Sequence, residues 1–227
     1  MKRTFFNSKS KDKQYLVIGC GRFGSSVAKK MCQLGNEVMV IDKDEDSIEN
    51  IAEQVTHTAI VDVTEERDLK SIGLGNFDVV IVAISSDIRA SIMVTIMAKE
   101  MGVPKIVCKA KDELQAKVLY KIGADKVVFP ERDMGIRLAY NLASENILDQ
   151  INLDPEYSIM EIVTPTNWVG KTIIELNLRA KYDITVLAVK TPSGLKVMPS
   201  PNYKMQEKNI LIIIGNTDKI GDIILHD

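Results

Sequence analysis

The chain has 227 residues, 45% of them hydrophobic, and a formal net charge of −2 at pH 7, which argues against a nucleic-acid-binding protein with its usual basic surplus. Its two histidines exclude a histidine-rich metal site, and its three cysteines contain no C-x-x-C pair and indicate reduced thiols. No apolar run reaches the roughly 20 residues that a membrane-spanning helix needs.

The first 13 residues are rich in lysine and arginine, and we expect a basic N-terminal arm over 1–13. From residue 14 to residue 148, short apolar runs alternate with helical patterns. Strands are expected near 14–20, 37–42, 57–62, 78–83, 105–110 and 126–129. Helices are expected near 22–34, 44–54, 64–72, 87–101, 112–122 and 131–148. Such alternation predicts an α/β domain over 14–148, with a Rossmann-like, doubly wound parallel sheet of six strands and right-handed crossovers.

The pattern changes after the sequence Asn152-Leu153-Asp154-Pro155. Alternating apolar and polar residues over 157–163 predict a half-exposed strand. A short helix is expected near 171–176, and further strands near 184–190 and 209–214. We therefore expect a second, smaller α+β domain over 149–227, which meets the first through the 131–148 helix.

A glycine-rich segment stands between the first expected strand and the first expected helix. It reads Gly19-Cys20-Gly21-Arg22-Phe23-Gly24. In dinucleotide-binding folds the first glycine makes the tight turn, the second lets a phosphate approach the backbone, and the third lets the helix pack on the strand. Its place between strand and helix, with the acid Asp42 ending the next strand, makes the motif specific.

Asp42 and the residues that follow the other strands form the expected ligand-binding rim, because ligands of such sheets bind outside the carboxyl ends of the strands. A carboxylate at Asp42 would accept hydrogen bonds from ribose hydroxyls and repel a 2′-phosphate, which disfavours NADP; a helix cap for the 44–54 segment is the alternative. The candidate nucleotide-binding residues are Gly19, Gly21, Arg22, Phe23, Gly24, Asp42, Lys43, Asp62, Val63, Thr64, Ser85, Lys109 and Glu131.

The cations on this rim favour a polyphosphate ligand. Arg22 and Lys109 suit the terminal phosphates of ADP or ATP, whereas the pyrophosphate of NAD or NADH needs little help from side chains. Glu131 is a hard oxygen ligand for a divalent cation, Mg²⁺ or Ca²⁺, beside phosphates. The alternatives are a surface Arg22 whose stem covers its helix and a Glu131 that complements the helix dipole.

A dehydrogenase would also need a proton donor and a substrate pocket, and the sequence offers no candidate for either. His57 begins a strand, far from the carboxyl edge, and His226 is penultimate. The second unit has the size of a regulatory module, and there is no Walker-type G-K-[S/T] segment. We therefore expect no enzymatic activity and no catalytic residue.

Several segments together resemble the RCK family (regulator of K⁺ conductance, also called KTN), built from TrkA-N and TrkA-C domains. In the first unit they are Gly19–Gly24, Val40–Asp42, Asp62–Glu66, Lys121–Asp125 and Pro130–Gly135. In the second unit they are Trp168–Ile173 and Glu175–Tyr182. The resemblance covers about 13–225, and it is to cytosolic gating subunits of Ktr-type potassium uptake systems (KtrA/KtrC-like).

The resemblance implies a mechanism. Family members pair as homodimers and assemble into an octameric ring beneath a membrane channel, and ATP or ADP in the Rossmann cleft changes the shape of the ring and biases the gate. The family arginine that reaches a γ-phosphate, often across the dimer, corresponds to Arg22, and the ribose acid to Asp42. The family glutamate near a bridging cation corresponds to Glu131. The 131–148 helix would pair subunits through Ile136, Leu138, Ala139, Leu142 and Ala143.

In Ktr-type members, the C-terminal domains of two subunits bind cyclic di-AMP at their interface. The resemblance assigns this site to Ile173, Ile174, Asn177, Arg179, Ile184 and Pro199 or Pro201. Apolar residues would sandwich the adenines, and Arg179 would meet phosphate. Ile173 and Ile174 are equally well explained as core residues.

We therefore expect a regulatory, gating subunit of a potassium channel or transporter of the Ktr or Trk type. It would be cytoplasmic and peripheral at the inner face of the cell membrane through its channel partner, and it would bind no nucleic acid. One alternative is an NAD(H)-dependent oxidoreductase or redox sensor. Another is a nucleotide-binding interaction module outside potassium transport.

Overall fold

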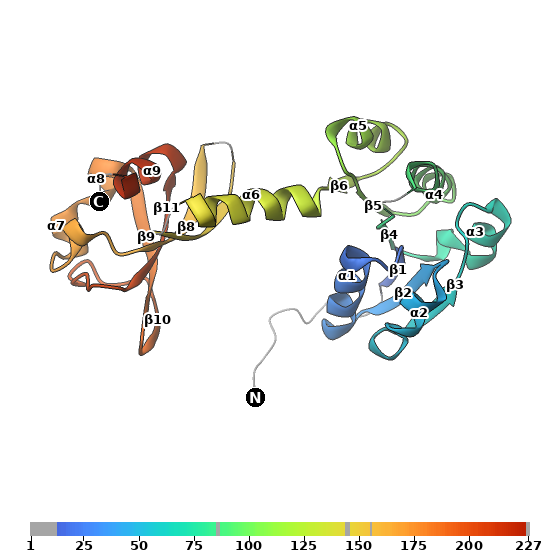
Figure 1. The fold of residues 1–227 in the computed structure, drawn as a ribbon, viewed down its shortest axis with the longest axis horizontal. Coiled ribbons are helices and arrows are strands. Elements are labelled where there is room, and N and C mark those ends of the chain that lie inside the picture. Colours follow the sequence, from blue (N-terminus) through green and yellow to red (C-terminus); the bar gives the residue numbers. More distant parts are fainter. Residues whose placement is uncertain (1–12, 85–86, 144–145, 155, 226–227) are drawn as a thin grey trace. The chain divides into compact units, whose positions relative to one another are not determined.

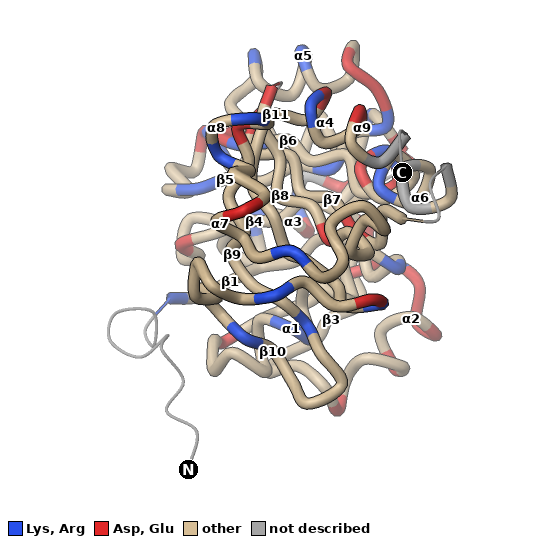
Figure 2. The backbone as a smooth tube through the Cα atoms, turned by 90° about the vertical axis from the view of Figure 1, so that its left-hand side faces the viewer, with Lys and Arg blue, Asp and Glu red and all other residues tan. Residues whose placement is uncertain are grey.

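The structure is a computed structural model that describes residues 13–84, 87–143, 146–154 and 156–225 (Figure 1). It contains two compact units, which divide between Arg132 and Asp133. The basic arm expected at 1–13 lies, apart from Lys13, outside the described residues. Acidic and basic residues are interspersed along the chain in Figure 2, in keeping with the small net charge.

The first unit contains the expected parallel sheet of six strands. They are β1 (Gln14–Ile18), β2 (Glu37–Asp42), β3 (His57–Ile60), β4 (Val79–Val82), β5 (Lys105–Lys109) and β6 (Lys126–Val128). Every pairing in this sheet is parallel, and the strand order is β3-β2-β1-β4-β5-β6. The order reverses between β1 and β4, which is the switch point where open α/β sheets bind ligands. The doubly wound Rossmann-like prediction is confirmed.

Helices cover both faces of this sheet. They are α1 (Arg22–Gln33), α2 (Glu45–Glu49), α3 (Glu66–Ile72), α4 (Ile88–Glu100) and α5 (Glu113–Lys121), with short 3₁₀ turns at Ala52–Gln54 and Leu74–Asn76. Side chains of α1 and α2 share one core cluster with Val17 of β1, and side chains of α3, α4 and α5 share another with Leu16 and Ile18. Because alternate residues of β1 point to opposite faces, both faces of this strand are buried.

The second unit is built on an antiparallel sheet. Its strands are β7 (Ile147–Asn152), β8 (Tyr157–Val163), β9 (Ile184–Thr191), β10 (Gly194–Val197) and β11 (Ile210–Asn216), in the order β10-β9-β11-β8-β7. Its helices are α7 (Ile173–Leu176), α8 (Leu178–Tyr182) and α9 (Thr217–Leu225), with a 3₁₀ turn at Thr166–Trp168. Alternate residues of β8 and β11 are buried, so one face of the sheet forms the core with these helices.

The helix expected at 131–148 is shorter than predicted. Helix α6 spans Pro130–Ala143, and β7 already begins at Ile147, so the prediction of helix up to residue 148 is wrong. The run Ile147–Asn152 has no strong local preference, and its pairing with β8 makes it a strand. The helix expected at 44–54 is also shorter than predicted, since α2 ends at Glu49 and a 3₁₀ turn follows at Ala52–Gln54. Strand β10 and helices α8 and α9 are additional to the expected elements.

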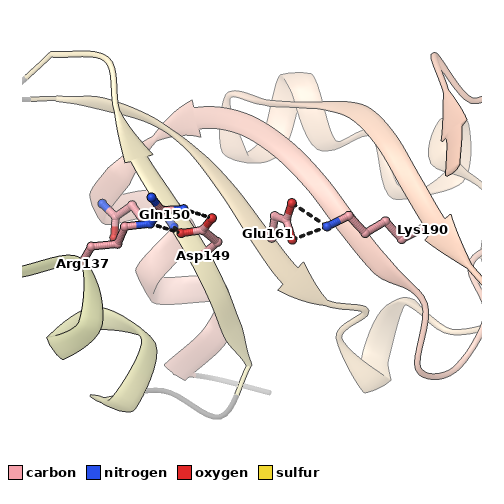
Figure 3. Close-up of polar contacts among 5 residues, drawn as sticks. All are labelled: Arg137, Asp149, Gln150, Glu161 and Lys190. Carbon is pink, nitrogen blue, oxygen red and sulfur yellow. Dashed lines mark hydrogen bonds and ion pairs between the residues drawn. The ribbon is translucent and has the colours of Figure 1, made fainter. Parts of the chain in front are cut away.

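Two ion pairs lie close together in the second unit (Figure 3). Arg137 of α6 donates two hydrogen bonds to the carboxylate of Asp149 on β7, and its Nε lies 2.6 Å from Oδ1. Lys190 of β9 donates to both oxygens of Glu161 on β8, at 2.7 and 2.6 Å. The hydrogen bond from Arg137 holds the pKa of Asp149 below its usual range. The Arg137–Asp149 pair therefore links α6 to the sheet of the second unit.

We expect Arg137→Ala to lower the free energy of unfolding of the second unit slightly at pH 7, since the pair is partly exposed and solvent weakens its attraction. A lowered folded pKa contributes stability above the unfolded pKa of about 3.9, and this stability is lost as the pH falls through the folded value. Urea unfolding followed by fluorescence of the single tryptophan, Trp168, which is 3% exposed in this unit, measures the difference. An equal difference at pH 7 and at pH 3 would contradict the ion-pair explanation, and Arg137→Lys should give an intermediate loss.

Candidate functional site

A cleft lies at the carboxyl ends of β1, β2, β3 and β4, on either side of the switch point. It has a volume of about 180 Å³. Residues from the end of each of these strands line it, together with the beginning of α4: Ile18, Gly19, Gly21, Ile41, Asp42, Lys43, Val61, Asp62, Val63, Thr64, Ala83, Ile84, Asp87 and Ala90. Seven of the predicted nucleotide-binding residues are in this lining: Gly19, Gly21, Asp42, Lys43, Asp62, Val63 and Thr64.

The three glycines of the motif differ in what an added Cβ would meet at each position. Gly19 has a φ of +102°, and a Cβ there would lie 3.0 Å from the carbonyl carbon of Ala83. A Cβ on Gly24 would lie 1.9 Å from the carbonyl oxygen of Gly19, so α1 packs directly on the turn. A Cβ on Gly21 would meet no described atom within 4 Å, so the backbone at Gly21 faces open space.

The N-terminus of α1 is open to an anion. Gly21 is its N-cap residue and supplies no side-chain hydrogen bond, and the first turn contains no acidic residue. The first N–H groups of a helix and its dipole together attract phosphate. The free space beside Gly21 and this uncapped helix therefore fit the phosphates of a nucleotide.

Asp42 joins the glycine turn to the turn after β2. Its Oδ2 accepts a hydrogen bond from the N–H of Cys20 at 2.6 Å, and its Oδ1 accepts one from the N–H of Asp44 at 3.0 Å. The cap of α2 is Asp44, which accepts a hydrogen bond from the N–H of Ser47 at 3.3 Å. The alternative of Asp42 as the helix cap is therefore wrong. A carboxylate has about four acceptor positions, so Asp42 keeps capacity for ribose hydroxyls.

The turn after β3 is organised around Asp62. Its Oδ1 accepts hydrogen bonds from the N–H of Thr64 at 3.0 Å and from the Thr64 hydroxyl at 2.7 Å. These two bonds, and to a smaller extent the charge of Lys43, lower the pKa of Asp62. The carboxylate is therefore ionised at neutral pH, and it holds Val63 and Thr64 at the edge of the cleft.

Lys109 and Glu131 meet outside this cleft. The Nζ of Lys109, whose side chain is 7% exposed, lies 2.6 Å from Oε1 of Glu131, whose side chain is 65% exposed. The hydrogen bond from Lys109 lowers the pKa of Glu131, and the charge of Arg22 acts in the same direction. The pair lines a separate cavity of about 300 Å³ with Ala110, Lys111, Phe129 and Arg132. The sequence predicted both residues as candidates but did not predict that they pair.

The described residues do not fit a metal site centred on Glu131. Among them, no group of three histidine, cysteine or carboxylate side chains is placed to hold a metal ion. The Glu131 carboxylate is already paired with the ammonium group of Lys109, which competes with a cation.

The remaining candidates of the first unit lie around the cleft. Arg22 is exposed at the start of α1, Phe23 is half-buried in the core beside it, and Gly24 is buried. These three are not among the residues that line the cleft. Ser85 lies outside the described residues. The sequence reasoning missed Asp87, although an acid at the beginning of a helix that follows a strand is a usable signal.

The residues assigned to cyclic di-AMP come from α7, α8, the start of β9 and the segment after β10. The N–H of Ile174 donates a hydrogen bond to the carbonyl oxygen of Pro201 at 3.0 Å. Four of these residues are exposed: Ile174, Asn177, Arg179 and Pro201. Pro199 is half-buried. Ile173 packs against the core of the second unit, and Ile184 is 1% exposed within it. Ile184 is therefore a core residue in this arrangement.

Family models match both units. The model of the TrkA-N domain matches residues 15–130, and the model of the TrkA-C domain matches residues 158–224. The chain is 42% identical to Ktr system potassium uptake protein A of Bacillus subtilis (strain 168), over 92% of this chain and 95% of that protein. It is 45% identical to Ktr system potassium uptake protein C of the same bacterium, with the same coverage.

Solved structures have the same fold. The crystal structure of the GsuK RCK domain gives a TM-score of 0.53 at 24% identity, over 96% of this chain and 47% of that one. The crystal structure of GsuK bound to ADP gives a TM-score of 0.51 at 25% identity, over 60% of this chain and 35% of that one. This chain thus spans less than half of either GsuK chain.

Both domain models match in the expected order, the strand order is that of a Rossmann sheet, and relatives above 40% identity extend over 92% of the chain. The chain is therefore similar to the Ktr system potassium uptake proteins A and C, and it belongs to the TrkA-N and TrkA-C (RCK) family.

Proposed function

We propose that this protein is a nucleotide-sensing regulatory subunit that gates a membrane potassium channel or transporter of the Ktr or Trk type. The observation that carries the proposal is the cleft at the switch point, where an uncapped α1 N-terminus stands beside the open backbone of Gly21 and the carboxylate of Asp42. The names of the B. subtilis relatives, both potassium uptake proteins, support the link to potassium transport.

The proposed ligand is ATP or ADP, with NAD or NADH as the competing ligand. The GsuK chain that is described as bound to ADP supports an adenine nucleotide. Arg22 stands at the first position of α1, exposed, where a phosphate chain leaving the Gly21 backbone would reach a guanidinium. Its charge acts on Glu131, so an added γ-phosphate would change the electrostatics of Arg22, Lys109 and Glu131 together.

The proposed assembly is a homodimer that builds an octameric ring beneath the membrane partner. Helix α6 supports pairing because its apolar side chains are uncovered in the single chain: Met134 is 59% exposed, Ile136 45%, Leu138 53% and Leu142 78%. Ala139 is exposed as well, and the side chain of Ala143 is outside the described residues. Exposed apolar stripes of this kind mark protein–protein interfaces.

The proposed location is the cytoplasmic face of the membrane, where the channel partner would hold the subunit. Among the described residues no helix is both long and apolar enough to cross a bilayer. The role is proposed to be non-enzymatic, and coupling would come from different ligand contacts in two states of the ring. Cyclic di-AMP is proposed as a further ligand of the second unit, where Ile174, Arg179 and Pro201 are each exposed.

Calorimetric titration of the full chain with ATP, ADP, NADH and cyclic di-AMP tests the proposal. We expect saturable binding of ATP and ADP at one site per chain, tighter than that of NADH. Binding of NADH alone would contradict the proposed ligand, and hydride transfer from NADH to a carbonyl substrate would favour an oxidoreductase instead. Size-exclusion chromatography of the same sample should give an oligomer, and a monomer would contradict the ring.

A further inference from the structure

Two long helices begin at the cleft, and their first turns differ. α1 and α4 have 12 and 13 residues, so they present dipoles of comparable size at the carboxyl edge of the sheet. Either N-terminus would attract phosphate. The first turn of α1 is uncapped and begins with Arg22, whereas α4 is capped by the side chain of Asp87.

Asp87 closes the N-terminus of α4 with a carboxylate that also faces the ligand cleft. Its Oδ1 accepts hydrogen bonds from the N–H groups of Arg89 at 2.9 Å and Ala90 at 3.0 Å. Asp87 and Ala90 both line the cleft. Two of the donors that a phosphate would use are therefore occupied, and a negative charge stands where the phosphate would approach.

We propose that Asp87 is a specificity-determining residue that keeps the phosphate chain of the bound nucleotide away from α4 and confines it to α1 and Arg22. This inference rests on the proposed nucleotide-binding function. The other acids in the lining have different tasks, since Asp42 holds the glycine turn and Asp62 holds the turn after β3. Among the carboxylates that line the cleft, only Asp87 caps a long helix, the 13-residue α4.

The test compares Asp87→Asn with the wild-type chain. Asparagine keeps a side-chain oxygen for the N–H groups of Arg89 and Ala90 but removes the charge. We expect the dissociation constants of inorganic pyrophosphate and of ADP, measured by calorimetry at low salt, to fall about 3- to 10-fold, because one unit of repulsion is removed at short range. The gain should shrink at high salt, where charges are screened.

Asp112→Asn is the matched control. Asp112 caps α5 by accepting a hydrogen bond from the N–H of Gln115 at 2.8 Å, and it is not among the residues that line the cleft. The control makes the same change in net charge and cap chemistry, and we expect it to leave both dissociation constants unchanged. An equal gain in the control would assign the effect to net charge and overturn the inference.

A second variant, Asp87→Ser, guards against a folding defect, since serine is a good cap without a charge. Unchanged or weaker pyrophosphate binding in both Asp87 variants, with folding intact by circular dichroism, would overturn the role of Asp87. A wild-type chain that binds neither ADP nor ATP would instead contradict the proposed function itself. The two failures are therefore distinguishable in one set of titrations.

Discussion

Arg22→Ala is expected to weaken ATP binding about 10- to 100-fold, because a charge-assisted hydrogen bond contributes about 1.5–3 kcal/mol. The loss for ADP is expected to be only a few-fold. The guanidinium stands at the first position of α1, beyond the Gly21 backbone that would receive the inner phosphates, so it is suited to the last phosphate of the chain. Calorimetric titration of the wild-type and variant chains with both nucleotides measures the two ratios.

Lys30→Ala is the matched control for this experiment. Lys30 is an exposed cation in the last turn of the same helix, so its removal changes net charge equally but far from the cleft. We expect no change for either nucleotide. Equal losses of ATP and ADP binding on Arg22→Ala would refute a role in reading the γ-phosphate, and a loss with Lys30→Ala would point to a general charge effect.

Gly24→Ala is expected to abolish detectable nucleotide binding and to destabilise the first unit by about 1–3 kcal/mol, the usual cost of overpacking. The added Cβ would lie 1.9 Å from the carbonyl oxygen of Gly19, and this obstacle is backbone, which has no rotamer to change. Helix α1 must therefore move away from the turn that presents its N–H groups to phosphate. Titration with ADP and urea unfolding followed by circular dichroism measure the two effects.

Gly21→Ala separates phosphate access from packing. A Cβ on Gly21 would meet no described atom within 4 Å, and its φ of −67° suits alanine. We expect unfolding like that of the wild type together with weaker ADP binding, since the methyl group enters the space proposed for phosphate. Normal stability in Gly24→Ala, or normal ADP binding in Gly21→Ala, would contradict this assignment of the two glycines.

Helix α6 ends earlier than its local sequence pattern predicts, because a strand follows it. Strand β4 was predictable because its continuous apolar run, Val79–Val82, is buried on both faces. The helical prediction failed beyond Ala143, because the preference of Ile147–Asn152 for a strand comes from pairing with β8. Strand β10 depends in the same way on its pairing with β9.

In the candidate site, too, some features follow from neighbouring residues and others from residues far apart in the chain. The glycine turn and Asp42 were found from short spacings, and Gly19, Gly21 and Asp42 line the cleft. The Nζ of Lys109 meets the carboxylate of Glu131 across 22 positions of the chain. No spacing in the sequence predicts this contact.

The amino-acid sequence by itself determined the Rossmann-like sheet, the glycine turn and the acid of the cleft, because periodicity and backbone sterics act over a few neighbouring residues. Only the tertiary structure decided which charges meet, because strand order brings together chain segments that periodicity treats as independent. In the folded protein the N-terminus of α1 has no side-chain cap, whereas Asp87 caps the N-terminus of α4 at the same cleft. This difference becomes visible only when both helix ends are placed in the structure.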